Sequence, residues 1–186
     1  MVTLMSLWIP ILASAVLVFI ASSVIHTLLG YHNSDMAKLP AESDVMDAMR
    51  KFSIPPGEYA MPFGGSMGAM KDPAYVDKLN KGPVAIMTVM PNGKFEMGGQ
   101  LAAWFVFCLV ISVFSAYITS HALQAGAPYL EVFRYVGATA FMGYALALWQ
   151  DSIWFKRKLS TTIKNTFDGL VYALLTAGMF GWLWPK

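Results

Sequence analysis

The stretch LMSLWIPILASAVLVFIASSVIHTLL, residues 4–29, decides the fold class because it contains no Asp, Glu, Lys or Arg. It is longer than the ~20 residues that a helix needs to cross a ~30 Å hydrocarbon layer. Comparable apolar stretches lie at about 99–124, 132–150 and 167–184. The sequence therefore predicts an all-α integral membrane protein built as a four-transmembrane-helix bundle in the lipid bilayer.

Composition supports this class. Hydrophobic residues make up 56% of the chain and charged residues only 13%, and the charges gather in residues 31–98 and 151–168. We therefore expect a first transmembrane helix at 1–30, an extramembrane loop domain at 31–98 and a three-helix transmembrane region at 99–186. The net charge of +2 gives no reason to expect nucleic acid as a partner.

Positive charge predicts the orientation in the membrane. With four crossings, the loops 31–98 and 151–166 share one side, and together they carry eleven of the thirteen Lys and Arg residues. Cytoplasmic loops are enriched in basic residues, so we expect both loops inside and both termini outside. The short basic loop carries most of this argument, because the rule weakens for loops as long as the first one.

The loop 31–98 has local structure of its own. Apolar residues recur at helical spacing over Asp44 to Phe52, and Asp72-Pro73 is typical of a helix start, with Gly82-Pro83 as its end. The β-rich run Val84 to Met90 and the segment Lys94 to Met97 flank a Pro-Asn-Gly turn, which predicts a β-hairpin.

Small residues at helical spacing predict where the helices pack, because helices in lipid associate where their backbones can approach closely. Three such seams are present: Ser112, Ala116 and Ser120; Thr139, Gly143 and Ala147; and Ala177, Gly178 and Gly181. We interpret them as packing surfaces, which are a commoner use of such residues than ligand binding.

Methionine suggests one possible ligand site. Nine of the thirteen methionines lie in loop 31–98, with Met46 and Met49, Met67 and Met70, and Met87 and Met90 at the same spacing. Thioethers are soft ligands that suit copper(I), which makes Met67 and Met70 candidate copper ligands. The alternative is that these flexible side chains only fill irregular apolar surfaces.

The histidines argue against a haem held by two histidines of one chain. His26 and His32 lie at the loop end of the first span, whereas His121 lies at the opposite end of the second. At ~1.5 Å rise per residue, His26 and His121 lie near opposite faces of the membrane.

Polar residues on the loop side form the third candidate site. His26, His32 and Asp35 follow the first span, Asp151 closes the third and Asp168 opens the fourth. In a compact bundle they could converge into a metal site or an acid–base cluster. The alternative for Asp168 is a structural role near a helix start, where the helix dipole favours a carboxylate.

Common enzyme signatures are missing from the sequence. There is no HExxH, GxSxG, Walker-type glycine loop or GxGxxG motif. We also expect the spans to lack the buried acidic or basic residues that usually mark a transport path or a proton relay. An enzyme is therefore less expected than a non-catalytic protein.

Several phrases are distinctive when taken together. They are Lys38-Leu39-Pro40 after His32, Pro55-Pro56-Gly57-Glu58-Tyr59, Lys81-Gly82-Pro83-Val84, Phe167-Asp168-Gly169-Leu170 and Phe180-Gly181-Trp182-Leu183-Trp184-Pro185. With these phrases the chain resembles a family of bacterial four-span inner-membrane proteins that has no established activity. The resemblance implies a bacterial source, four spans and a soluble loop, and it assigns no functional residue.

The hypothesis that follows is an accessory, scaffold or assembly subunit of a bacterial inner-membrane complex. It would contact a membrane-protein partner, or another copy of itself, through its helices and its loop domain. The small-residue seams and the weakly apolar loop motivate this hypothesis. A copper-binding protein that uses the loop methionines is the alternative, and a small transporter or membrane enzyme is a further one.

Overall fold

The computed structural model describes residues 2–94 and 96–186. The chain divides into two compact units: Met1–Met36 with Glu96–Lys186, here called the helical unit, and Ala37–Phe95, here called the loop unit. The loop unit lies inside the expected domain 31–98, while residues 31–36 pack with the helices. Each unit is described by itself.

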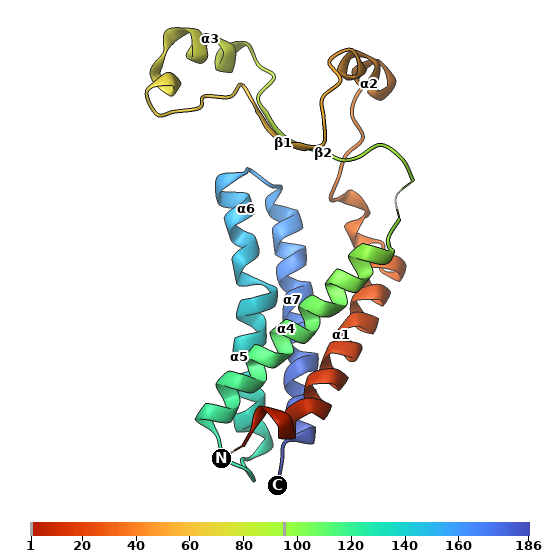
Figure 1. Cartoon of the computed structure of the whole chain (residues 1–186), viewed down its shortest axis with the longest axis vertical. Coiled ribbons are helices and arrows are strands. Elements are labelled where there is room, and N and C mark those ends of the chain that lie inside the picture. The colour runs from red at the N-terminus through yellow and green to blue at the C-terminus, as the bar shows by residue number, and fades with distance from the viewer. Residues whose placement is uncertain (1, 95) are drawn as a thin grey trace. The chain divides into compact units, whose positions relative to one another are not determined.

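In the described part of the chain, four helices of 16 to 25 residues form the helical unit (Figure 1). Helix α4 packs on α1 and on α5, and α7 packs on α5 and on α1, so that the four close into a ring. Short helical segments join or extend them. The elements are η1 (Leu4–Leu7), α1 (Trp8–Leu28), η2 (Tyr31–Ser34), α4 (Gly98–Ala122), α5 (Tyr129–Tyr144), η4 (Leu146–Leu148), α6 (Trp149–Trp154) and α7 (Leu159–Leu183).

Among the described residues, three helical segments are long and apolar enough to cross a membrane. They are Leu4–Leu28, Gly98–Ala122 and Leu159–Leu183. The expected continuous span at 132–150 is instead interrupted after Tyr144, where α5 ends and η4 begins. The 16 residues of α5 measure about 24 Å and include Glu131 and Arg134. Four crossings are therefore not established by length and hydropathy.

Helix α7 begins earlier than the apolar stretch 167–184 indicates. Its first turn is polar, and the Thr162 hydroxyl lies 2.6 Å from the Ser152 hydroxyl of α6. Hydropathy detects only the apolar part of such a helix, so the sequence-based start was eight residues late. Asp168 is consequently in the interior of α7, and the expectation that it opens this helix was wrong.

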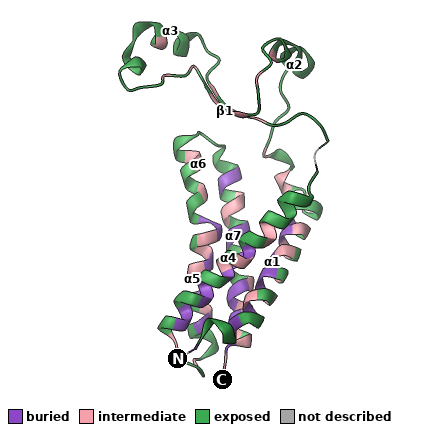
Figure 2. Ribbon diagram, in the orientation of Figure 1, coloured by how far each residue is buried: buried purple, intermediate pink, exposed green. Residues whose placement is uncertain are grey.

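The buried residues lie in the helical unit (Figure 2), and the apolar ones among the described residues form two clusters. One joins Leu7, Val132, Phe180 and Trp184 near the termini. The other includes Val18, Cys108, Ala140, Tyr144 and Tyr172.

The packing seams were predicted in part. Ser112, Ala116 and Ser120 of α4 are buried, which confirms that seam. On α5 the buried face is instead Val132, Val136, Ala140 and Tyr144. Helix α7 contributes a glycine where it approaches the end of α5 most closely: a Cβ on Gly169 would lie 2.8 Å from the Cβ of Ala145.

Polar contacts cross the bundle between α1 and α4. The hydroxyls of Ser14 and Ser112 lie 3.0 Å apart and are buried. The Trp104 indole donates to the Ser22 hydroxyl at 2.8 Å. Such bonds satisfy side chains that would otherwise meet hydrocarbon.

Different segments of the chain lie at the two ends of the helical unit, with both termini at one end (Figure 1). The Gly126 amide of the α4–α5 turn donates to the Pro185 carbonyl at 2.8 Å, which places that turn beside the C-terminus. At the other end, the Lys158 ammonium donates to the Ser34 carbonyl at 2.9 Å. The chain after α1 and the basic connection before α7 therefore share one end, as the sequence predicted.

The loop unit contains short elements: α2 (Glu42–Arg50), β1 (Gly57–Met61), η3 (Ala69–Lys71), α3 (Pro73–Lys81) and β2 (Ala85–Val89). Both expected helices are present. Asp72 caps α3, because its carboxylate accepts the Ala74 amide at 2.8 Å.

The expected hairpin partner was wrong. Strand β2 pairs antiparallel with β1, with Tyr59 opposite Met87. Lys94, Glu96 and Met97, the described residues of the expected second strand, lie outside any strand. The physical reason is length: β1 offers five residues for pairing, whereas the segment 94–97 is shorter and runs into α4 at Gly98.

No residue within 37–94 is buried (Figure 2). Large apolar side chains are exposed instead, among them Phe52 at 75% and Phe63 at 80%. The loop unit therefore has secondary structure without an apolar core of its own in this part of the chain.

Candidate functional site

The loop-side end of the helical unit is built around η2, the short turn that follows α1. The Lys164 ammonium of α7 holds this turn by donating to the Ser34 hydroxyl at 2.9 Å and to the Asp35 carboxylate at 2.8 Å. It also donates to the Tyr31 carbonyl at 2.5 Å. One lysine thereby fixes the backbone of η2 against α7.

His32 of η2 lies between two carboxylates. Its Nδ1 is 2.6 Å from Asp35 Oδ2, and its Nε2 is 2.8 Å from Asp168 Oδ2. The Tyr31 hydroxyl donates to the other oxygen of Asp168. Asp168 is only 2% exposed, so the bundle interior holds a carboxylate whose partners all come from η2.

Hydrogen bonds within this cluster lower the pKa of Asp35 and raise the pKa of Tyr31. Burial alone would raise the pKa of the Asp35 carboxyl, but hydrogen bonds from Lys164 and His32 outweigh burial and lower it to about 2. The pKa of the Tyr31 hydroxyl is raised, first by burial and then by its hydrogen bond to Asp168. Asp35 is thus ionised and Tyr31 is a neutral donor at neutral pH.

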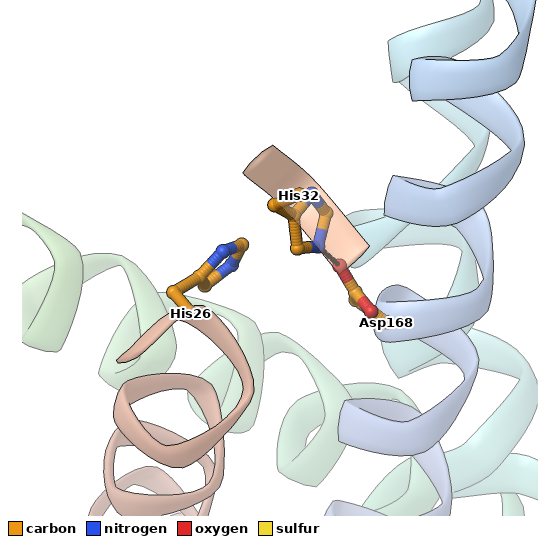
Figure 3. A group of neighbouring side chains, drawn as sticks. All are labelled: His26, His32 and Asp168. Atoms are coloured by element: carbon orange, nitrogen blue, oxygen red, sulfur yellow. Dashed lines mark hydrogen bonds and ion pairs between the residues drawn. The ribbon is translucent and has the colours of Figure 1, made fainter. Parts of the chain in front are cut away.

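His26, in the last turn of α1, completes a group of three possible metal ligands (Figure 3). Its ring centroid lies 4.5 Å from that of His32. One ligand atom each from His26, His32 and Asp168 lie within 4.8 Å of one another. A tetrahedral ion with bonds of ~2.0–2.1 Å separates its ligands by roughly 3.4 Å, so a small movement of the side chains would let all three bind.

The groups around these three resemble the outer shell of a metal site. A ligating histidine usually donates its other ring nitrogen to a carboxylate, and ligating carboxylates are themselves hydrogen-bonded. Asp35 meets Nδ1 of His32, which leaves Nε2 to face Asp168. Tyr31 meets the second oxygen of Asp168.

A cavity of about 990 Å³ opens beside the cluster, within the helical unit. His26, His32 and Asp168 stand at its polar part. Its apolar walls come from α4, α5, η4 and α7, and include Leu101, Trp104, Phe107, Leu148 and Tyr172. A cavity of this size is at the upper end for small-molecule sites.

Two buried hydroxyls in the cavity wall have no hydrogen-bond partner within the described residues. They belong to Tyr144 of α5 and Tyr172 of α7. Both residues are nearly inaccessible to solvent, and their rings meet edge to face with centroids 5.6 Å apart. Both hydroxyl oxygens are inaccessible, so they belong to the packed interior between the helices and not to a surface that a ligand in the cavity could reach.

The structure brings together His26, His32, Asp35 and Asp168 from the predicted set. Asp151 is not part of this cluster: its carboxylate pairs with Arg157 at 3.4 Å. The expected meeting of Asp151 with the histidines is therefore not seen in the described structure, because its carboxylate pairs with Arg157 of the basic connection instead. His121 lies in the last turn of α4, at the terminal end of the bundle, as predicted.

Met67 and Met70 belong to the loop unit, where they are 76% and 44% exposed. Their role as copper ligands stays a prediction.

Sequence reasoning missed Tyr31, Lys164, Tyr144 and Tyr172. A signal was present on α7, where Lys164, Asp168 and Tyr172 follow one another at intervals of four and so share one helix face. It went unused because the helix was expected to begin at residue 167, which left Lys164 in a loop.

No family model, curated protein or solved structure matches this chain. The function is therefore argued from the site itself.

Proposed function

We propose that the helical unit binds one divalent transition metal ion through His26, His32 and Asp168. The observation that carries this proposal is the convergence of three potential ligand atoms within 4.8 Å, beside a large cavity. Three protein ligands with an open fourth position are typical of catalytic zinc sites. The proposal keeps three of the five polar residues expected from the sequence: Asp35 becomes a hydrogen-bond partner of His32, and Asp151 is left out.

The donor set indicates the class of metal. Two imidazole nitrogens and one carboxylate oxygen suit zinc, iron(II), cobalt or nickel better than copper(I), which prefers sulfur. Ionised Asp35 balances Lys164, and the Asp168 carboxyl group is itself one of the three ligands. A dication would therefore meet a site whose nearest charges are favourable.

Cobalt(II) is a suitable probe because its visible absorption reports tetrahedral nitrogen and oxygen ligands directly. Purified full-length protein, carrying an affinity tag without histidine, is stripped with chelator and titrated with cobalt. We expect about one ion per chain with intense visible bands, lost in His32→Gln. His121→Gln is the matched control, since that histidine lies at the other end of α4, and it should bind normally.

The competing role for the cluster is a structural clamp between η2 and α7. A clamp needs the hydrogen bonds of His32 but no metal. Wild-type protein that shows no cobalt bands at several equivalents of cobalt would overturn the metal proposal and leave the clamp.

The membrane arrangement extends this proposal. Three segments are apolar enough to span, and we infer that α5, η4 and α6 together make a fourth crossing, because α5 packs on α7 and α4 within the same ring. The membrane would be the bacterial inner membrane. The basic residues of loops 31–98 and 151–166 favour the cytoplasmic side for both. A cytoplasm-only reporter fused to the C-terminus should be inactive.

The loop unit supports a second candidate function, that of an accessory or assembly subunit acting by protein contact. The observation that favours it is the absence of any buried residue within 37–94, together with exposed Phe52 and Phe63. A segment with so little apolar burial gains stability when a partner covers it. Gentle detergent extraction followed by native mass measurement tests this: a clean monomer without companions counts against it.

A further inference from the structure

All three hydrogens of the Lys164 ammonium group have an acceptor on or beside η2. The group donates to the Tyr31 carbonyl at 2.5 Å and to the Ser34 hydroxyl at 2.9 Å. Its third hydrogen bond, at 2.8 Å, goes to Oδ1 of Asp35. An ammonium group has only three hydrogens to donate, and the Lys164 side chain is only 22% exposed. Lys164 therefore has a fixed position, in contrast to the flexible lysines of an open surface.

Asp35 extends this constraint to the imidazole of His32. Its Oδ1 accepts from Lys164, and its Oδ2 lies 2.6 Å from Nδ1 of His32. Because both oxygens have a partner, the carboxylate cannot rotate without losing a contact. The side chains of Asp35 and His32 are 17% and 14% exposed, so water screens these contacts less than it does on an open surface. The contacts from Lys164 through Asp35 to His32 thereby fix the orientation of the imidazole ring.

The orientation of the ring decides which nitrogen of His32 can bind a metal ion. Asp35 holds Nδ1, which leaves Nε2, and Nε2 lies 2.8 Å from Oδ2 of Asp168. Both of these residues belong to the group of candidate ligands. A carboxylate at the other ring nitrogen commonly orients a metal-binding histidine, and loss of such an outer partner lowers metal affinity about 10- to 100-fold.

We propose that Lys164 is a positioning residue for the metal centre: it acts through Asp35 to hold His32 with Nε2 directed at the metal position, and it does not itself bind the ion. The inference rests on the proposed metal-binding function and deepens it, because it assigns a determinant of metal affinity outside the three ligands. A lysine that only anchored η2 to α7 would not need the contact with Asp35.

Lys158 is the matched control at the same end of the helical unit. Its ammonium group also holds η2, because it donates to the Ser34 carbonyl at 2.9 Å. Among the described residues it has no hydrogen bond to Asp35 or His32. Both lysines therefore anchor the same turn, and only Lys164 is connected to a candidate ligand.

Cobalt titration of full-length protein in detergent, followed by visible absorption, gives a dissociation constant and the ligand geometry for each variant. Lys164→Met keeps the apolar stem and removes the ammonium group, and we expect it to raise the cobalt dissociation constant about 10- to 100-fold. Lys158→Met should bind cobalt like the wild type. Circular dichroism of the metal-free variants shows whether each is folded.

Asp35→Ala removes the residue that connects Lys164 to His32. If Lys164 acts through Asp35, the double variant Lys164→Met with Asp35→Ala should bind cobalt as weakly as Asp35→Ala alone, because effects within one network are not additive. Asp35→Ala also tests the proposal if Lys164→Met does not fold. Cobalt affinity that is unchanged in folded Asp35→Ala would overturn the positioning role.

The outcomes separate the role of Lys164 from the metal centre itself. Wild-type protein without cobalt bands overturns the metal centre, and the positioning role with it. If the wild type binds cobalt and folded Lys164→Met binds it equally well, the positioning role is wrong and the metal centre stands. Equal losses in Lys164→Met and Lys158→Met also overturn it, because metal binding would then depend only on the anchoring of η2. A loss confined to Lys164→Met, and not increased in Asp35→Ala by the second substitution, supports it.

Discussion

The helical unit and the loop unit are stabilised in different ways. In the helical unit, buried side chains from four helices meet in two clusters, and glycine and serine allow close approach. In the loop unit the described elements are held by backbone hydrogen bonds, one helix cap, a single pair of strands and exposed side-chain contacts such as the Lys81–Asp77 ion pair. A two-stranded sheet is marginal in water by itself. Substitutions should therefore affect the two units very differently.

The largest expected effect is at Asp168, the buried carboxylate of α7. Asp168→Asn removes a charge that meets both His32 and Tyr31. Breaking a buried charge pair by removing one partner costs roughly 3–5 kcal/mol. Unfolding in detergent, followed by circular dichroism, should show a loss of that order in metal-free protein.

Asp151→Asn is the matched control for this prediction. Asp151 is half-exposed and pairs with Arg157, so its loss should cost at most about 1 kcal/mol. If Asp168→Asn and Asp151→Asn are equally stable, Asp168 is not the centre of a buried network and is excluded as a functional residue.

The next effect concerns close packing of α7 on α5. A Cβ on Gly169 would lie 2.8 Å from the Cβ of Ala145 and 3.2 Å from the Tyr144 backbone, which cannot easily move. Gly169→Ala should therefore lower the free energy of unfolding in detergent by about 1–3 kcal/mol, the usual cost of overpacking.

Gly178→Ala on the same helix is the comparison, because its nearest neighbour there is the Tyr129 hydroxyl at an ordinary 3.6 Å. Gly178→Ala should leave the unfolding midpoint nearly unchanged. A loss for Gly178→Ala as large as that for Gly169→Ala would show that the helices are more loosely or differently packed than described.

The sequence predicted the helical class and three spanning segments because hydrocarbon demands long apolar runs, which are visible without any tertiary information. The sequence-based prediction failed where contacts between helices determine the helix boundaries. The break after Tyr144 occurs where α5 meets Gly169, and the polar first turn of α7 is held by Ser152. Neither contact has a local signature in the sequence.

The sequence likewise predicted some residues of the candidate site and missed others. His26, His32 and Asp168 were expected on one side of the membrane because that depends only on the number of crossings between them. Tyr144 and Tyr172 were missed because apolar stretches contain many tyrosines, and nothing local distinguishes an unpaired hydroxyl from an interfacial one.

A smaller effect is expected for the polar contact between α1 and α4. Ser112→Ala removes the partner of the Ser14 hydroxyl, which still donates to the Pro10 carbonyl at 2.6 Å. Hydrogen bonds between membrane helices contribute on average about 0.6 kcal/mol. Detergent unfolding of Ser112→Ala should therefore show a loss of that size. A loss above about 2 kcal/mol would mean that Ser14 has no adequate alternative acceptor.

The smallest effect on stability is expected in the loop unit, at Phe52 and Phe63. Both rings are exposed, so replacing each with serine removes almost no buried area and should change the free energy of unfolding of the helical unit by less than about 0.5 kcal/mol. The same double variant should lose any protein that co-purifies with the wild type, because exposed aromatic rings are the groups that a partner would cover.

The matched control for that variant is Lys71→Ser with Lys94→Ser, which changes exposed charges of the loop unit and leaves both rings in place. Co-purifying proteins that the control retains and the aromatic double variant loses would support an accessory role. A stability loss above about 2 kcal/mol in the aromatic variant would contradict the comparison, because it would show that these rings are buried in the folded protein.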